Sequence, residues 1–305
     1  MTLLSPYLHL LVTRAETLAA LVAIGFIVGE FLARGPFTQA LVYGQHIIRT
    51  LGRKLNRENR SVATLVYRGI VAVLMLLVPA ILAASLLSKP LPWLELLAAF
   101  LLIAWFGHCF QTMATMRLIA RAKTAGLPLE LPGLDYLFND SHAVIRYLIT
   151  TRMDAFAIGI VGGCFWFTLG GFVGIAIYLT LAAASKAYTQ HIAFGWAARS
   201  LFMLAHALPT LIARALIFFA AFFTPHTKPF AGLFAKSWLA AIALTLAIAL
   251  GGKMPEGEMP WVGNASARLT HTHLRRAMHL LVAASILLLL LLAHQQLFNA
   301  LKMFM

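Results

Sequence analysis

Long apolar runs, separated by short segments that hold most of the charge, are the feature that most constrains this chain. The clearest run covers residues 277–293 and contains an unbroken stretch of isoleucine and leucine at 286–292. A helix needs about 20 mostly apolar residues to cross the roughly 30 Å hydrocarbon core of a bilayer. Because a soluble protein could not cover so much apolar surface, we predict an all-α, polytopic integral membrane protein.

The composition agrees with this class of protein. Of the 305 residues, 61% are hydrophobic and only 11% are charged, and the mean hydropathy is +0.85. We expect about 5–7 transmembrane helices plus amphipathic interfacial helices, within a single membrane domain over residues 1–305. The candidate spans are residues 18–32, 70–87, 94–113, 155–184, 201–223, 238–250 and 277–293.

Two of these runs have unusual lengths. The run at 155–184 is too long for one ordinary crossing and rich in glycine, so it is either one tilted helix or a helix followed by a re-entrant piece. The run at 238–250 is short, and a segment of that length can also dip into the membrane without crossing it. The glycines expected at close helix contacts are Gly162, Gly163, Gly170 and Gly171.

Positive charge is concentrated beside the apolar runs. In a soluble protein a net charge of +14 would suggest nucleic acid, but these cations lie where membrane proteins face anionic lipid. We therefore expect membrane lipids and no nucleic acid as partners, and the sequence indicates no particular protein partner.

The same charges predict a topology. The basic stretches at 49–68 and 117–154 are separated by two crossings, so they share a side, which the positive-inside rule makes the cytoplasm. The first includes an amphipathic helix at 40–55 that we expect along the membrane face. A helix should begin near Asn139-Asp140-Ser141, which are all good capping residues. The side of the arginines within 268–276 depends on how the two unusual runs are counted.

The usual signatures of catalysis are missing. Neither the Gly-Lys-Ser/Thr triplet of a phosphate-binding loop nor a Gly-x-Ser-x-Gly elbow occurs. His271 and His273 are two residues apart and flanked by arginines, which disfavours a metal site. Cys109 and Cys164 lie inside apolar runs and are expected to be buried as small hydrophobes.

Ionisable residues inside the apolar runs allow two interpretations each. His108 and His206 are either functional groups or neutral histidines satisfied by a neighbouring helix. Arg214 is either a snorkelling, interfacial cation or an anion contact that faces a polar cavity. Glu30 is the nearest carboxylate at membrane depth that could pair with it.

The most distinctive local sequence runs from Phe194 to Arg199, with Gly195 between the rings of Phe194 and Trp196. It is either an interfacial aromatic anchor with a flanking cation, or the wall of a site for a large planar ligand beside an anion contact. A second distinctive piece is Pro260-Trp261-Val262-Gly263, followed by Leu274-Arg275-Arg276-Ala277 at the last span.

These segments resemble the adenosylcobinamide-phosphate synthase family of cobalamin biosynthesis, the CobD/CbiB family. Phe194-Gly195-Trp196-Ala197-Ala198, with Leu204-Ala205 and Pro209, is similar to its Phe-Gly-Trp-Ala-Ala…Leu-Ala-Asn…Pro segment. The second piece is similar to its Pro-Trp-Leu-Gly and Ile-Arg-Arg-Ala elements. Phe165-Trp166 resembles its Leu-Phe-Trp segment, and Gly44 with Leu55-Asn56-Arg57 fits its early loop. The pieces keep the family's order across most of the chain.

The resemblance implies a multi-pass protein of the bacterial inner membrane that joins adenosylcobyric acid, a corrinoid, to aminopropanol or its phosphate. ATP and Mg²⁺ would serve the formation of the amide. The catalytic residues expected here are Asp154, Arg146 and Arg152, with Asp154 also the magnesium ligand. The substrate-binding residues expected here are Phe194, Gly195, Trp196, Arg199, Trp261 and Gly263.

The chain departs from the family at its acidic positions. Counting back from Trp166, only Asp154 keeps a carboxylate, and the acidic pair after Phe-Gly-Trp is replaced by Phe202 and Met203. Two interpretations follow. One is a divergent synthase, and the other is a non-catalytic relative such as an AmpE-like membrane sensor or regulatory protein, whose Leu-Phe-Trp-Phe…Gly-Gly stretch is similar to residues 165–171. A channel or transporter has weaker support, because inverted repeats are not evident.

Overall fold

The structure is a computed structural model, and it describes residues 17–27, 36–56, 60–88, 92–124, 141–188, 192–254, 257–263 and 268–304. Within these ranges, five helical stretches are long and apolar enough to cross a membrane. They are Val62–Leu87, Trp93–Phe110, His142–Ala187, Trp196–Phe222 and His271–His294. The structure therefore confirms an all-α, polytopic membrane protein.

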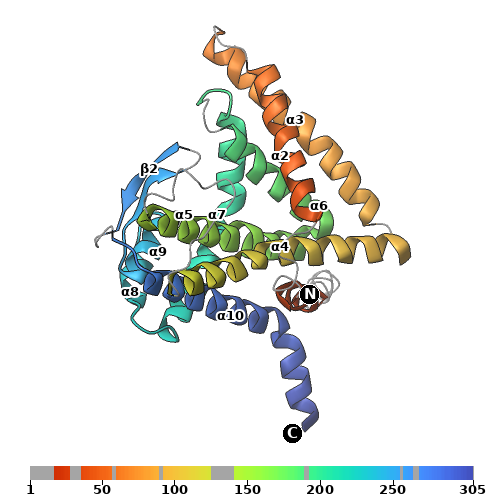
Figure 1. Ribbon diagram of the computed structural model, residues 1–305. Coiled ribbons are helices and arrows are strands. Elements are labelled where there is room, and N and C mark those ends of the chain that lie inside the picture. The colour runs from red at the N-terminus through yellow and green to blue at the C-terminus, as the bar shows by residue number, and fades with distance from the viewer. Residues whose placement is uncertain are drawn as a thin grey trace.

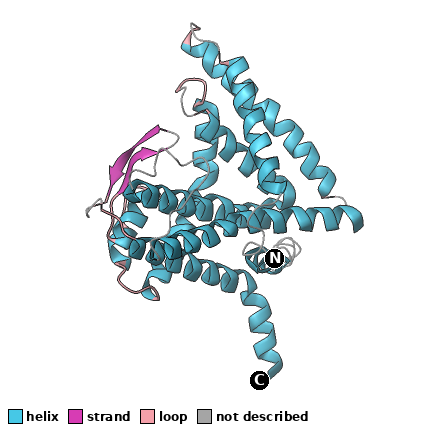
Figure 2. Cartoon of the chain, in the orientation of Figure 1, coloured by secondary structure: helices cyan, strands magenta, loops and turns pink. Residues whose placement is uncertain are grey.

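Helices follow one another along nearly all of the described chain, and only one pair of strands interrupts them (Figures 1 and 2). The elements are α2 Pro36–Leu55, α3 Val62–Leu87, α4 Pro92–Thr124, α5 Ser141–Asp154, the π-helix η2 Ala155–Gly162, α6 Gly163–Ala187, α7 Trp196–Phe222, α8 Pro229–Leu233, α9 Trp238–Leu246, β1 Leu250–Met254, β2 Gly257–Val262 and α10 His271–Phe304. A shorter apolar helix, Thr17–Ile27, precedes them. It covers the beginning of the predicted span at 18–32, and residues 28–32 lie outside the described part of the chain.

The long glycine-rich run reverses its direction inside the protein. Gly171 has φ 60° and ψ −145°, which are not helical, and it divides α6 into two halves. A Cβ on Gly174 would collide with the carbonyl oxygen of Trp166, and a Cβ on Gly162 would collide with the Tyr178 ring. Residues on the two sides of Gly171 are thus in direct contact, so the run is not a single tilted helix. The alternative, a helix followed by a piece that turns back, fits the structure.

The glycines of this run do not all serve packing. Gly162, Gly163 and Gly171 are buried, as expected. Gly170 is exposed, and a Cβ added to it would meet no heavy atom within 4 Å. The prediction of a close helix contact is therefore wrong for Gly170, because this residue lies at the outer end of the turn.

The short sixth run does not form a spanning helix. Its helical part, α9, has only 9 residues and ends where Ala247 takes the left-handed conformation, with φ 54°. At 1.5 Å per residue such a helix is far shorter than a bilayer core. The chain then enters an antiparallel β-hairpin, in which Gly252 pairs with Met259 and Met254 with Gly257. The sequence analysis predicted no strands here.

Buried side chains form two separate clusters. The large core cluster lies between α4, α5, η2, α7 and α10 and includes Phe106, Ile149, Phe156, Ile217 and Leu281. The small core cluster lies between α3, the end of α6 and the start of α7. It includes Ala72, Val73, Tyr188, Phe194 and Ala198.

The amphipathic helix predicted at 40–55 corresponds to α2. A Cβ on its Gly52 would collide with the Tyr188 ring, and the Tyr188 hydroxyl donates to the carbonyl oxygen of Ile48 at 3.4 Å. Burial raises the pKa of Tyr188 to about 12, which keeps this donor protonated at neutral pH. α2 and α3 meet at one corner of the molecule and then diverge (Figure 1). The position of α2 relative to a membrane stays a prediction.

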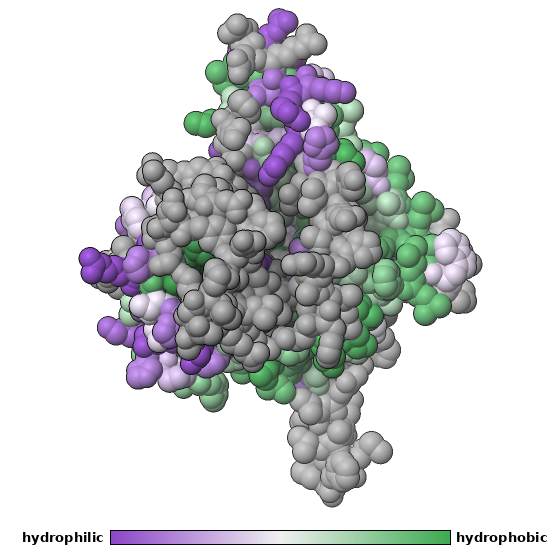
Figure 3. Space-filling model, viewed as in Figure 1, coloured by the Kyte–Doolittle hydropathy of each residue, from purple (hydrophilic) through white to green (hydrophobic). Residues whose placement is uncertain are grey.

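Polar and apolar surfaces lie on different parts of the molecule. In Figure 3, hydrophobic atoms gather on the right, where α3 ends and α4 begins, and hydrophilic atoms gather at the top and on the left. The right-hand side chains include Leu82 and Leu86 of α3 and Trp93 and Phe100 of α4, all more than half exposed. Such a surface suits lipid and not water.

Candidate functional site

A polar stripe follows one face of helix α5. His142, Arg146, Thr150 and Asp154 are spaced four residues apart, which places them on the same side of a helix. Their neighbours Ile145, Leu148, Ile149 and Met153 are buried in the large core cluster. Arg146 and Thr150 are themselves only 7% and 5% exposed. Polar groups at such depth are costly unless they are paired or used, so this stripe is the natural place to look for a site.

The β-hairpin covers the first half of this stripe. The guanidinium carbon of Arg146 lies 4.9 Å from the centre of the Trp261 ring, at the distance of a cation–π contact. One turn earlier, Nδ1 of His142 lies 2.6 Å from the carbonyl oxygen of Leu269. Helix α5 is therefore in contact with Trp261 and Leu269, which are more than a hundred residues away in the sequence.

Glycines in the hairpin allow this arrangement. A Cβ on Gly252, which has φ +85°, would lie 2.7 Å from Cζ2 of Trp261, so the ring rests directly on the glycine. Gly263 has φ +102°, and a Cβ there would collide with the carbonyl oxygen of Ile248. The predicted residues Trp261 and Gly263 thus belong to one built feature together with Arg146. Trp261 is 54% exposed, which leaves part of its surface open.

Arg152 points to a different side of α5. It lies two residues beyond Thr150, which is about half a turn around the helix. Its guanidinium interacts electrostatically with Tyr147 and with the thiol of Cys109 on α4. Its Nε is sealed from solvent and has no hydrogen-bond partner. The three α5 residues named from the sequence therefore occupy two faces, with Arg146 and Asp154 on one and Arg152 on the other.

The segment from Phe194 to Arg199 lies at another place. Phe194 is buried in the small core cluster, where its ring meets Tyr188 edge to face at 5.0 Å. Arg199 donates from Nε to the Gly195 carbonyl at 3.3 Å and from Nη2 to the carbonyl of Ile192. Gly195 precedes the first residue of α7, and Trp196 is 55% exposed.

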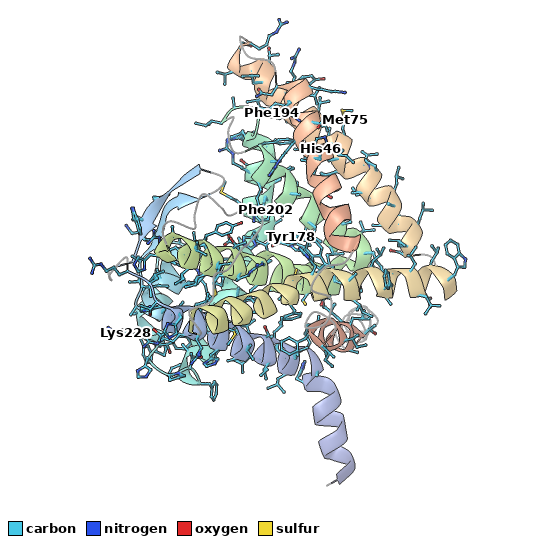
Figure 4. The ribbon with its side chains drawn as sticks, viewed as in Figure 1. His46, Met75, Tyr178, Phe194, Phe202 and Lys228 are labelled. Atoms are coloured by element: carbon cyan, nitrogen blue, oxygen red, sulfur yellow. The ribbon has the colours of Figure 1, made fainter. Side chains whose placement is uncertain are left out.

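These contacts close the turn before α7 and occupy the Arg199 donors with backbone carbonyls. Figure 4 shows Phe194 near the corner where α2 and α3 meet, away from α5. The structure therefore does not place this segment in one cluster with Arg146 and Trp261. The role of these residues in binding stays a prediction.

The membrane-depth histidine on α7 is satisfied by a neighbouring helix. Nδ1 of His206 lies 2.7 Å from the Tyr178 hydroxyl, and the His206 ring stacks on Phe202 at 4.9 Å. The Trp166 indole donates to the carbonyl oxygen of Ala205 at 3.0 Å. That carbonyl lacks its helical donor because Pro209, four residues later, has no N–H. The contacts between α6 and α7 therefore support the packing interpretation of His206.

Arg214 and His273 also have structural partners. Nη1 of Arg214 donates to the carbonyl oxygen of Ala235 at 3.1 Å, which ties α7 to the segment before α9. His273 accepts the backbone N–H of Thr270 through Nδ1 at 3.1 Å and so caps the start of α10. Glu30, the carboxylate considered for Arg214, lies outside the described residues.

A metal-binding carboxylate cluster is not found in the described part of the chain. There, no group of three or more His, Cys, Asp or Glu residues is placed to hold a metal ion. Among side chains that the structure describes, Asp154 is the carboxylate nearest to the site, and Glu95 lies exposed in the first turn of α4. These residues do not match the set of acids that the family resemblance implies for Mg²⁺ and ATP.

Sequence reasoning missed part of this site. It named Arg146 and Trp261 but not their contact, and it did not name His142 or Thr150. The four-residue spacing of His142, Arg146, Thr150 and Asp154 was a signal that could have identified the stripe. The cover over the stripe had no such signal, because the hairpin was not foreseen.

Comparison with known proteins gives one informative relative. No protein family matches the chain, and no solved structure matches it. The cobalamin biosynthesis protein CobD of Rhizobium meliloti (strain 1021) is 25% identical to the chain over 200 residues. The aligned region spans 61% of this chain and 61% of that relative. This similarity supports a CobD-like relationship for a membrane protein with the helices described above.

Proposed function

We propose that the protein is a divergent CobD-type membrane protein of cobalamin biosynthesis. Its reaction would be the ATP-dependent formation of an amide between adenosylcobyric acid and aminopropanol or aminopropanol phosphate, in the bacterial inner membrane. Two findings support the proposal. The relative named above is a cobalamin biosynthesis protein, and Trp261 of one family-like segment lies against Arg146 of α5.

The observation that carries the proposal is the contact between Arg146 and Trp261. Trp261 belongs to the Pro-Trp-Val-Gly element, and Arg146 belongs to the basic helix that precedes Phe165-Trp166. A half-exposed indole beside a buried guanidinium offers an apolar face and a cation in one place. The corrinoid substrate has both a large ring and the carboxylate of a propionate side chain, so this pair suits such a ligand.

The geometry supports a role in the site for some of the other predicted residues and not for others. Arg146 would orient a carboxylate of the substrate, and Asp154 would act farther along the same stripe. The residues Phe194, Gly195, Trp196 and Arg199 would have to act at a separate place, because they pack at the start of α7. The stripe on α5 offers one carboxylate for Mg²⁺, Asp154, and the described residues hold no group of three or more metal ligands.

A non-catalytic, AmpE-like sensor or regulatory protein on the same scaffold is the second candidate. Its basis is the departure of the sequence from the family at its acidic positions, where Phe202 and Met203 stand. In that case the stripe on α5 would bind a ligand without transforming it.

Complementation of a bacterium that lacks the synthase tests the proposal. We expect the wild-type chain to restore cobalamin synthesis and to consume the corrinoid substrate, which can be followed by chromatography of corrinoid intermediates. Asp154→Ala and Trp261→Ala should reduce product at least about tenfold, as expected for the loss of a charged or aromatic contact. Ile47→Ala, at an exposed position on α2, serves as the matched control.

Each outcome decides between the candidates. Restoration that is equal in wild type and Asp154→Ala would remove Asp154 from the site. A wild type that accumulates in the membrane, binds corrinoid and never restores synthesis would favour the non-catalytic candidate. A wild type that does neither would overturn both.

A further inference from the structure

Arg152 is a part-buried cation whose charge has no oppositely charged partner among the described residues. It lies on the α4 side of α5, on a helical stretch long and apolar enough to cross a membrane. It makes no hydrogen bond and no ion pair with any residue that the structure describes, and its Nε is sealed from solvent. The groups that interact with it electrostatically, Tyr147 and Cys109, are neutral when protonated.

Comparable arginines in this protein are occupied. The guanidinium of Arg199 donates to the carbonyls of Gly195 and Ile192, and that of Arg214 donates to Ala235. Arg146 lies over the Trp261 ring. The Nε atoms of Arg146 and Arg214 also lack a partner, but each of these residues has another contact, so Arg152 is the one of these four arginines with neither a hydrogen bond nor a ring contact among the described residues.

An unpaired charge at this depth lowers stability. Even the lowest estimates put an arginine at the centre of a membrane helix at about 2.5–3.5 kcal/mol. A chain that only needed to fill this space would be more stable with an apolar residue of similar length. Residues that reduce stability in this way are typical of sites that bind a ligand.

We propose that Arg152 binds the anionic group of a ligand, a phosphate or a carboxylate, on the α4 face of α5. Two N–H groups of a guanidinium match two oxygens of either anion, so the ligand would supply the missing charge and the missing acceptors. The Tyr147 hydroxyl is a further donor on the same helix. The Nη atoms would approach the anion, because the side chain is only partly exposed and Nε is enclosed.

This site goes beyond the proposed function. It lies about half a turn away from the Arg146 stripe, and the argument from the Arg152 charge does not depend on which reaction the stripe supports. If the ligand is the phosphate-bearing substrate of a synthase, the inference also rests on the proposed function. The experiment is therefore chosen so that the two can fail separately.

The test compares wild type, Arg152→Met and Arg214→Met as purified full-length proteins in detergent. Melting temperatures are measured with inorganic phosphate, pyrophosphate or acetate, and with chloride at equal ionic strength as reference. We expect wild type to be stabilised by at least one of the three anions relative to chloride. Arg152→Met should melt at or above wild type in chloride, because it removes an uncompensated charge, and should lose the anion effect.

Arg214→Met is the matched control, since it removes the same charge from another membrane helix. It should melt below wild type in chloride, because it loses the bond to Ala235, and it should keep the full anion effect. In titrations, the apparent dissociation constant of the stabilising anion should rise at least about tenfold in Arg152→Met and stay within about twofold in Arg214→Met.

Three results would overturn the proposal. They are a wild type that no anion stabilises, an anion effect that survives in Arg152→Met, or an Arg152→Met protein that melts as far below wild type as Arg214→Met. The last would show that Arg152 has a structural partner. Stabilisation that depends on Arg152, in a chain that never restores cobalamin synthesis, would keep the anion site and remove the proposed function.

Discussion

Gly252 shows how one residue can hold the candidate site together. It sits under the Trp261 ring with φ +85°, a conformation that side-chain-bearing residues rarely adopt. The Trp261 ring also contacts the guanidinium of Arg146. The absence of a side chain at position 252 is therefore what lets the hairpin place an indole beside α5.

We expect Gly252→Ala to lower the free energy of unfolding by about 1–3 kcal/mol, because the added Cβ meets the ring and the backbone is strained. Thermal unfolding of the purified protein in detergent measures this change. Gly170→Ala is the matched control, since no heavy atom lies within 4 Å of its added Cβ. It should stay within about 0.5 kcal/mol of wild type. Equal stability of both variants would mean that Trp261 does not rest on Gly252.

At the scale of elements, α6 and α7 are joined where each is irregular. α6 turns back at Gly171, and this reversal brings Trp166 and Tyr178 together at 6.3 Å between ring centres. α7 contains Pro209, which leaves the Ala205 carbonyl without its helical donor. The Trp166 indole fills that vacancy. A backbone carbonyl that lacks its helical donor in α7 thus accepts a hydrogen bond from a side chain of α6.

A double-mutant cycle tests this account. Trp166→Phe should lower the free energy of unfolding by about 1–2 kcal/mol, because the part-buried Ala205 carbonyl loses its donor. In a Pro209→Ala background the backbone N–H at 209 can bond to Ala205, so the same change should be smaller. We expect a coupling energy of about 1 kcal/mol, measured by thermal or denaturant unfolding. Strictly additive effects would contradict the assignment of the Ala205 carbonyl to Trp166.

At the scale of the whole molecule, the contacts constrain the topology. The side chain of His142 and the backbone of Leu269 are 2.6 Å apart, and points on opposite sides of a bilayer core are separated by roughly 30 Å. The segment before α10 and the start of α5 must therefore face the same side of the membrane.

This predicts a pattern of labelling in cells. Single cysteines at Asn59, Gly126 and Thr270 should react from the same side, which the positive-inside rule makes the cytoplasm. A membrane-impermeant maleimide should fail to label them in intact cells and should label them in inverted vesicles. Cys109 and Cys164 are buried and provide a silent background. Labelling of Thr270 and Gly126 from opposite sides would contradict the placement of α10 beside α5, and labelling of all three in intact cells would reverse the orientation.

Much of the fold could be predicted because the length and hydropathy of each segment decide by themselves whether it can span a membrane. Span candidates such as 70–87 and 277–293 correspond to α3 and α10, since a run of apolar residues has no stable place outside a bilayer. The helix expected near Ser141 begins at that residue. The run at 238–250 forms no spanning helix, and the strand after it was not predicted, because nine apolar helical residues look the same whether they enter a membrane or pack beside a strand.

The candidate site was predicted as a set of residues and not as an arrangement. Arg146, Asp154, Trp261 and Gly263 were identified from a basic helix and from family-like motifs, but their sequence distance hides the contact. Phe194 and Arg199 were grouped with them, yet the structure uses them to pack and close the turn before α7. Which side chain a motif presents to its neighbour depends on how helices cross, which the sequence does not state.

The sequence by itself determined that this chain is an all-α membrane protein with its charge between the spans, because hydrophobic length and charge position are properties of each segment alone. The tertiary structure decided the reversal at Gly171, the hairpin that brings Trp261 to Arg146, and the lack of a hydrogen-bond partner for Arg152 Nε among the described residues. These features depend on which segments touch. A glycine, an indole or a guanidinium has its role fixed only by the group that the fold places against it.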